Sequence, residues 1–397
     1  MPTLGSAWIA CASFVISPII TRIHYPDQNR QRFLDSDGPA VITRIIVDSP
    51  YDESHAGVIK SAYVCAFNTA KDFPQNAKAF IAAGAVDPHM RLFDPSRQFE
   101  LGEDLEFVRL VALRSVENMA ELDEFVKAIE GAPQSLVAMI AFLAKADQVI
   151  LEDNRLEVLH SLIWIVHVLL EKSGDLAAYC STPRAILELF GIIEIVYNTA
   201  DDLSNDEEEE ETVGGQQIQG PTPRPPSSVT RLNRKVAEVT QILVTVSGVD
   251  QALPKFLDDQ QLVSQLLSYL RSKPQKVVDT EHLIPLDEAR LTAAALCLGN
   301  LARTDLQCKR LVEEHSDVIQ SLIDSWLLDG GALGHVQARH ALTGLLKNLS
   351  IPVENRATMI DLDLHVAASR FIDSAVPPLQ VNCLSIIKLL TAQGVQA

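Results

Sequence analysis

Residues 299–312 read GNLARTDLQCKRLV, and residues 347–360 read KNLSIPVENRATMI. The two stretches align without a gap at a constant offset of 48 residues. In each one, a long apolar segment ends at an asparagine, a short polar break follows, and a second amphipathic segment begins. A period of about 40–50 residues with amphipathic helices in each unit is typical of armadillo and HEAT arrays. The alignment therefore predicts an internally repeated, helical protein.

Fainter copies of the same unit lie upstream. Asn68 ends an apolar segment and is followed by Gln75 and Asn76, while Asn118 lies 50 residues beyond Asn68. Each unit reads as a long helix, a break, a short helix and a further helix, which resembles armadillo repeats more than the two-helix HEAT unit. A single unit cannot close a core, so neighbouring units must stack. We expect an all-α fold, an armadillo-repeat right-handed superhelical solenoid with roughly seven or eight units.

The composition agrees with helical packing and restricts the partners. Apolar residues make up 47% of the chain, aromatics only 6%, and the formal net charge is −19. Direct nucleic-acid binding is not expected, because phosphate neutralisation needs a basic face. An acidic protein favours basic partners through electrostatic steering. The same charge also serves solubility, and the composition does not choose between these two roles.

One segment interrupts the repeats. Residues 201–211 hold eight acidic residues and no basic one, and Gly, Gln and Pro dominate the stretch after them. Such a segment buries too little apolar surface to order itself. We expect armadillo repeats over 1–200, an acidic Gly/Pro-rich disordered insert over 201–231, and further repeats over 232–397. Neither end shows a polar capping helix, so either the caps are unusual or these repeats are part of a longer array.

The cysteines and the apolar segments point to the cytosol. The six cysteines are scattered, form no Cys-x-x-Cys pair and lie in apolar helical contexts, which is typical of buried thiols in a reducing compartment. The apolar stretch 7–20 lacks the basic region of a signal peptide and is too short to span a bilayer. We expect this stretch to be a solenoid helix, and the protein to be cytoplasmic, monomeric and without membrane insertion.

No constellation for covalent catalysis stands out. The pairs Gly214-Gly215 and Gly330-Gly331 lack the Lys-Ser/Thr of a phosphate loop. His335 and His340 are five positions apart, but no third metal ligand lies near them in the sequence. We expect no cofactor, no metal and no catalytic residue.

The recurrent asparagine is the main candidate for binding. Asn68, Asn118, Asn300 and Asn348 end the long apolar helices, whose equivalent positions line the concave surface of a solenoid. An amide can pair with a peptide donor and acceptor together, which suits recognition of an extended chain. It can equally cap a helix or bridge to the next repeat, and the spacing does not decide between these roles. Arg303, His340 and Lys347 complete the candidate groove.

The stretch 291–392 resembles a known family. The segments LTAAALCLGNLARTDLQCKRLV, HVQARHALTGLLKNLSIPVENRATMI and PPLQVNCLSIIKLLTAQ are similar to consecutive repeats of the small-G-protein GDP-dissociation stimulators (SmgGDS). The resemblance implies a non-enzymatic guanine-nucleotide exchange factor and chaperone for Rho- and Ras-type GTPases with basic, prenylated tails. In that family an acidic concave groove meets the tail and groove asparagines contact the GTPase; the matching positions are Asn300 and Asn348.

The resemblance also implies a location and leaves alternatives open. The family is cytosolic, with association to the endoplasmic reticulum, mitochondria or nucleus. A general armadillo adaptor without exchange activity is the alternative function. An importin-type carrier fits less well, since Trp8, Trp164 and Trp326 do not recur beside the asparagines.

Overall fold

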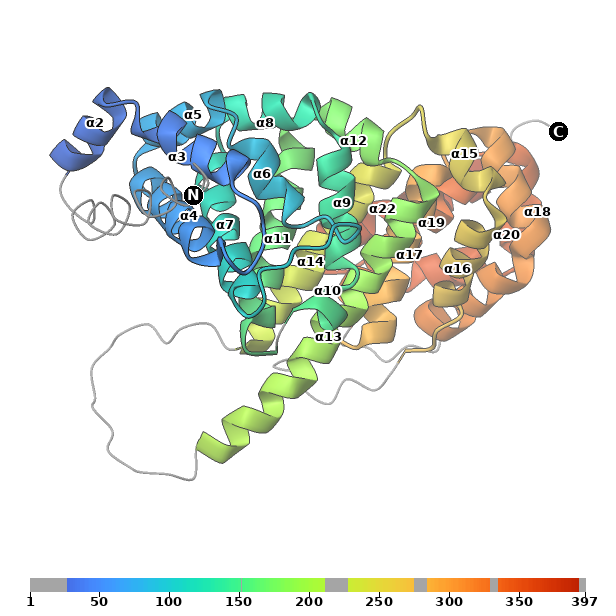
Figure 1. The fold of residues 1–397 in the computed structure, drawn as a ribbon. Coiled ribbons are helices and arrows are strands. Elements are labelled where there is room, and N and C mark those ends of the chain that lie inside the picture. The colour runs from blue at the N-terminus through green and yellow to red at the C-terminus, as the bar shows by residue number, and fades with distance from the viewer. Residues whose placement is uncertain (1–26, 151, 211–227, 275–283, 329–334, 393–397) are drawn as a thin grey trace, which may run out of the picture. The chain divides into compact units, whose positions relative to one another are not determined.

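The computed structural model describes residues 27–150, 152–210, 228–274, 284–328 and 335–392 (Figure 1). These residues form helices, with one isolated bridge between Asp52 and Glu100 and no strand. The predicted all-α class is confirmed. Contacts divide the chain into two compact units, Met1–Cys180 and Ser181–Ala397, which we call unit 1 and unit 2.

The described part of unit 1 consists of three consecutive helix triplets and two further helices, α10 and α12. Its third helices α4, α7 and α11 pack side by side in that order. The short α10 lies between the second and third helices of the last triplet. The helices are α2 (Asp27–Asp35), α3 (Gly38–Asp48), α4 (Ala56–Ala70), α5 (Pro74–Ala82), α6 (Val86–Arg91), α7 (Asp104–Ala120), α8 (Asp123–Glu130), α9 (Gln134–Leu143), α10 (Ala146–Val149), α11 (Glu152–Lys172) and α12 (Gly174–Cys180).

Unit 2 begins with two long helices that pack on each other, and three triplets follow. The third helices α17, α19 and α22 again pack side by side, and α14 packs on α17. The helices are α13 (Pro183–Glu210), α14 (Ser228–Ser247), α15 (Leu253–Asp258), α16 (Gln260–Leu270), α17 (Leu286–Leu301), α18 (Asp305–Leu322), the π-helix η1 (Ile323–Leu328), α19 (Val336–Leu349), α20 (Val353–Asp361), α21 (Leu364–Ser369) and α22 (Pro377–Thr391). The backbone of α18 leaves the helical region at His315, so its two halves serve as first and second helices.

The repeated sequence pattern corresponds to these triplets. The asparagine ends the third helix, and the polar break after it starts the first helix of the next triplet. At one break, Thr304 accepts from the Gln307 backbone N–H, and the Gln307 side chain accepts from the Thr304 N–H. This capping box satisfies two N–H groups that a helix start leaves unpaired. The armadillo-type array predicted from the 48-residue offset is confirmed.

Side-chain amides tie two of the first helices, α5 and α20, back to the third helix before each of them. Asn76 Nδ2 donates to Thr69 O at 3.0 Å, and Asn355 Nδ2 donates to Leu349 O at 2.9 Å. Both amides are buried, and each acceptor lies at the end of a third helix, where carbonyls lack helical partners. These contacts fix the turn between successive triplets.

The helix bounds change the expected organisation around the insert. Helix α13 continues to Glu210 and α14 begins at Ser228, so both ends of the segment predicted to be disordered over 201–231 are helical. Glutamate favours helix, and an existing helix extends at little cost. Residues 211–227 lie outside the described residues, as does the apolar stretch 7–20. The division between units falls before α13, which packs on α14.

Among the described residues, no single helix is long and apolar enough to cross a membrane, although two bent pairs of neighbouring helices reach that length and composition together.

Candidate functional site

The third helices carry half-buried residues at the same three positions. These positions are the asparagine and the residues one and four places before it. Offsets of 50 residues in unit 1 and 48 in unit 2 relate them. We call these the ladder positions: Val64, Phe67 and Asn68; Arg114, Glu117 and Asn118; Trp164, His167 and Val168; Leu296, Gly299 and Asn300; Gly344, Lys347 and Asn348.

In unit 2 the ladder asparagines bind the neighbouring third helix. Asn300 Nδ2 donates to Val244 O at 3.0 Å and to Ser247 Oγ at 3.1 Å. Asn348 Nδ2 donates to Gly299 O at 2.9 Å. These bonds are the bridge between repeats, which is one of the roles that the sequence left open. The Nδ2 atom of each amide is therefore held by the fold, while its Oδ1 has no hydrogen bond among the described residues.

In unit 1 the equivalent asparagines have no such bond. The Asn118 Nδ2 atom is buried without a hydrogen-bond partner among the described residues. The Asn68 side chain likewise has none there. The charged ladder positions of α7 are occupied instead by ion pairs: Arg114 contacts Glu117 at 2.7 Å and also pairs with Glu157 of α11.

The other predicted groove residues of unit 2 are dispersed. Arg303 forms an exposed ion pair with Asp250 at 2.6 Å. Lys347 Nζ donates to Asn382 Oδ1 at 3.3 Å, so both side chains serve packing between α19 and α22. His340 lies on the groove described next, and its side chain has no hydrogen bond among the described residues.

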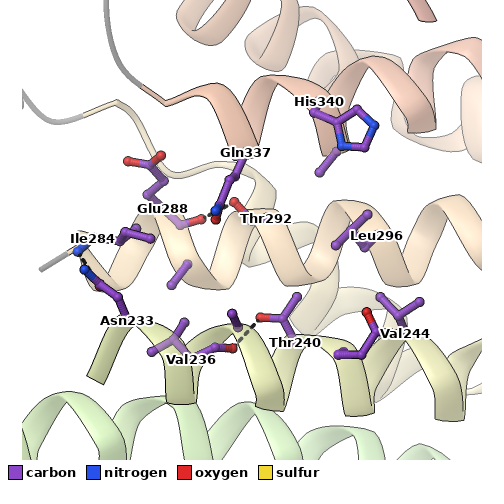
Figure 2. Close-up of a pocket in the computed structure, with 14 residues that line it drawn as sticks. Asn233, Val236, Thr240, Val244, Ile284, Glu288, Thr292, Leu296, Gln337 and His340 are labelled. Atoms are coloured by element: carbon purple, nitrogen blue, oxygen red, sulfur yellow. Dashed lines mark hydrogen bonds between the residues drawn. The ribbon is translucent and has the colours of Figure 1, made fainter. Parts of the chain in front are cut away.

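A groove of about 250 Å³ runs across α14, α17 and α19. Figure 2 shows Thr240 and Val244 on one helix, Thr292 and Leu296 on the middle helix, and His340 on the third. Its floor is apolar and its polar lining is almost entirely uncharged. The lining residues are Asn233, Val236, Ala237, Thr240, Gln241, Val244, Ile284, Glu288, Ala289, Thr292, Leu296, Gln337, His340 and Ala341.

The single carboxylate in this lining, Glu288, has a histidine partner. Glu288 Oε2 lies 2.5 Å from Nδ1 of His335, and both side chains are less than one-tenth exposed. The His335 ring packs edge-on against Trp326, whose Nε1 donates to Ser272 O at 2.8 Å. Arg339 Nε donates to Trp326 O at 3.3 Å. The lining of this groove thus holds one carboxylate, and that carboxylate is hydrogen-bonded to His335.

Sequence analysis missed most of the lining residues. It used the offset of 48 residues, which relates α17 to α19 only. Asn300 and Asn348 each donate to a backbone carbonyl of the preceding helix, Val244 O and Gly299 O, and these two bonds give an offset of 55 residues between α14 and α17.

The described residues offer little for covalent chemistry. They contain no group of three or more His, Cys, Asp or Glu side chains placed to hold a metal. The five described cysteines are free and buried. Burial raises the pKa of Cys65, Cys180 and Cys297 to about 12, so these thiols are not poised as nucleophiles.

The helix triplets define a helical-repeat scaffold, with a groove across α14, α17 and α19. No protein-family model matches the chain. Rap1 GTPase-GDP dissociation stimulator 1-B of Xenopus laevis is 36% identical over 99 residues, which are 25% of this chain and 16% of the Xenopus protein. GTPase-GDP dissociation stimulator vimar of Drosophila melanogaster is 28% identical over 123 residues, 31% of this chain and 19% of that protein. The predicted resemblance to this group is confirmed, over less than a fifth of each relative's length.

A designed armadillo repeat protein also aligns structurally with the chain. The alignment covers 88% of this chain and 99% of the designed one, at 15% identity and a TM-score of 0.30. The assignment of the fold rests on the helix triplets themselves.

Proposed function

We propose that this chain binds small GTPases and stimulates release of GDP without covalent chemistry. The observation that carries the proposal is the 36% identity over 99 residues to a protein named Rap1 GTPase-GDP dissociation stimulator. The fold supports it, because a repeat scaffold presents a long face built from its third helices.

The mechanism is a shift of population. A scaffold that binds the opened or nucleotide-free GTPase more tightly than the GDP-bound form lowers the affinity for GDP by the same factor. Such a scaffold must be rigid, so that binding energy is not lost in ordering it. The Asn300 and Asn348 bridges between third helices supply that rigidity in unit 2.

The partner we propose is a Rho- or Ras-type GTPase with a basic, prenylated tail. The net charge of −19 favours a basic tail through long-range attraction, which salt of about 0.15 M screens partly. Acidic residues outnumber basic ones in unit 1, whereas unit 2 is nearly balanced outside residues 201–211. We therefore assign the tail to acidic surface outside this groove, whose lining holds a single carboxylate, Glu288. The five free cysteines agree with a cytosolic location, which we also propose.

The decisive experiment is release of fluorescent GDP from Rho- and Ras-type GTPases, with and without their basic tails. We expect faster release with the full chain, and a weaker effect without the tail or at high salt. Binding without faster GDP release would contradict the exchange function and would favour an adaptor that has no exchange activity. No binding to any GTPase of these types would contradict both.

A site variant should avoid the structural asparagines, because Asn300 and Asn348 hold helices together. We choose Gln337→Ala with His340→Ala, since neither side chain has a hydrogen bond among the described residues. The matched control is Gln260→Ala, on the exposed start of α16. We expect the double variant to weaken GTPase binding severalfold if the GTPase covers the groove, with unchanged thermal unfolding. Unchanged binding would show that the GTPase binds another face of the chain.

A further inference from the structure

His335 lies in the left-handed region of the backbone, directly before α19. Its φ is 59° and its ψ is 28°, values that are uncommon for a residue with a side chain. The other described non-glycine residues with a positive φ are all aspartates, Asp37, Asp72 and Asp363. A residue persists in this region only where its surroundings fix it there. The contacts of His335 therefore hold the start of α19 in its present conformation.

The imidazole ring of His335 is held on two sides. Its Nδ1 lies 2.5 Å from Glu288 Oε2 of α17, and its ring packs edge-on against Trp326 of η1, with the ring centroids 5.3 Å apart. The side chains of His335 and Glu288 are 8% and 9% exposed. The backbone N–H of Arg339 donates to His335 O at 2.9 Å, which opens the hydrogen-bond ladder of α19. The first turn of α19 thus depends on where the pair of His335 and Glu288 places the backbone.

Two further titratable groups among the described residues face this pair. Arg339 of α19 and Tyr197 of α13 lie within electrostatic reach of Glu288. Arginine stays charged in proteins. Burial raises the pKa of Tyr197, and its hydroxyl donates to Ile284 O, so Tyr197 stays uncharged. Histidine is the side chain of this set that changes its charge between pH 5 and 8.

The charge of His335 sets the strength of its contact with Glu288. Burial alone favours a neutral ring, but here a carboxylate compensates the ring's charge at hydrogen-bond distance. An imidazolium adds Coulomb attraction to the hydrogen bond, and the low exposure of the pair leaves that attraction poorly screened. A neutral imidazole keeps the hydrogen bond alone. The unfavourable backbone at His335 opposes the contact in both cases, so loss of the proton shifts the balance towards an open first turn.

We propose that His335 and Glu288 form a pH-sensitive latch, which holds the first turn of α19 closed while His335 is charged and loosens it when the proton is lost. Figure 2 shows Glu288 beside Gln337 at one end of the groove across α14, α17 and α19, and both residues line it. Opening of the first turn therefore changes this end of the groove. The latch is a property of α19 with or without a GTPase, so it stands or fails separately from GDP release.

The test is amide hydrogen exchange in the full chain, followed by NMR at about pH 6 and about pH 8. The protection factor, which is the intrinsic exchange rate divided by the observed one, removes the ordinary effect of pH on exchange. We expect the Arg339 amide to be protected roughly fivefold more at the lower pH. The Leu346 amide, farther along α19, should change by less than about twofold. Equal protection of Arg339 at both pH values would overturn the proposal, as would a His335 ring signal that does not change between them.

Two variants assign the pH dependence to the pair. His335→Asn places a residue that tolerates the left-handed backbone but does not change its charge in this pH range, so the protection of the Arg339 amide should no longer depend on pH. Glu288→Gln keeps an acceptor without the charge, and the higher protection at the lower pH should disappear. The matched control is His365→Asn, on the exposed side of α21, which should keep the wild-type pH dependence. Thermal unfolding checks that each variant folds; a folded His335→Asn with the wild-type pH dependence would disprove the latch.

Discussion

The third helices of unit 1 and those of unit 2 carry asparagine at the same ladder position, yet the amides have different surroundings. Asn348 donates to Gly299 O of the preceding third helix, whereas Asn118 Nδ2 is buried without a partner among the described residues. The residue equivalent to Gly299 in unit 1 is Phe67. A glycine lets two helices approach closely, and a bulky residue keeps them apart. A Cβ placed on Gly299 would already lie 3.9 Å from Leu345 Cα.

A residue that recurs in every repeat of the sequence need not make the same contact in each of them. The asparagines of unit 2 bridge to a carbonyl of the preceding helix, whether that residue is Val244 or Gly299, and Asn118 of unit 1 does not. In unit 1 the corresponding face is held by the ion pairs of Arg114 with Glu117 and Glu157. In unit 2 it is held by the uncharged amide bridges of Asn300 and Asn348.

The largest expected effect is on the apolar packing of the third helices, which the two units share. Leu162 in α11 and Leu342 in α19 occupy the same place relative to the ladder positions, and both are fully buried. Replacing either with Ala removes apolar contact and leaves a cavity, so each should lower the free energy of unfolding by about 2–5 kcal/mol. Urea unfolding measures the change, and the exposed Leu384→Ala should stay within about 0.5 kcal/mol. A large cost in one unit and a negligible one in the other would show that the packing is not equivalent.

The next effect concerns a buried histidine of unit 1. His89 is 1% exposed, its Nδ1 lies 2.6 Å from Ala85 O, and its Nε2 has no partner among the described residues. Burial lowers the pKa of His89 to about 4, below about 6.5 for an unfolded histidine. Between these values the unfolded chain binds more protons, so stability present above pH 6.5 is lost as the pH falls towards 4.

The size of this loss in stability follows from the difference between the folded and unfolded pKa of His89. From pH 7 to pH 5 the free energy of unfolding should fall by about 2 kcal/mol on account of His89. Urea unfolding at both pH values, for the wild type and for His89→Leu, isolates this part. The variant should lose that much of the pH dependence, even if it is less stable throughout. An identical pH dependence in both proteins would mean that His89 is protonated in the folded state.

Sequence alone predicted the repeat and the ladder register, because both follow from local apolar periodicity and a constant offset. It did not predict the partners of Asn300 and Asn348, since these depend on which backbone atoms a neighbouring triplet brings near. It missed Thr240 and Thr292 because the insert lies before α14 and the offset there differs. The helical extension of α13 through Glu210 was also missed, because an acidic run reads as solvated whether or not it is helical.

The smallest expected effect concerns the ladder asparagines, which have different surroundings in the two units. Gly299 lies in the last turn of α17, where carbonyls lack a helical N–H partner, and the Asn348 amide supplies one. Asn348→Leu should therefore cost about 1–3 kcal/mol in the free energy of unfolding, because it leaves that acceptor unpaired. Asn118→Leu replaces a buried, unpaired amide with an apolar group of similar size, so it should be neutral or slightly stabilising. Urea unfolding of both variants measures whether each change raises or lowers the free energy of unfolding. Equal destabilisation would show that Asn118 finds a hydrogen-bond partner in solution, and that the two units use their asparagines alike.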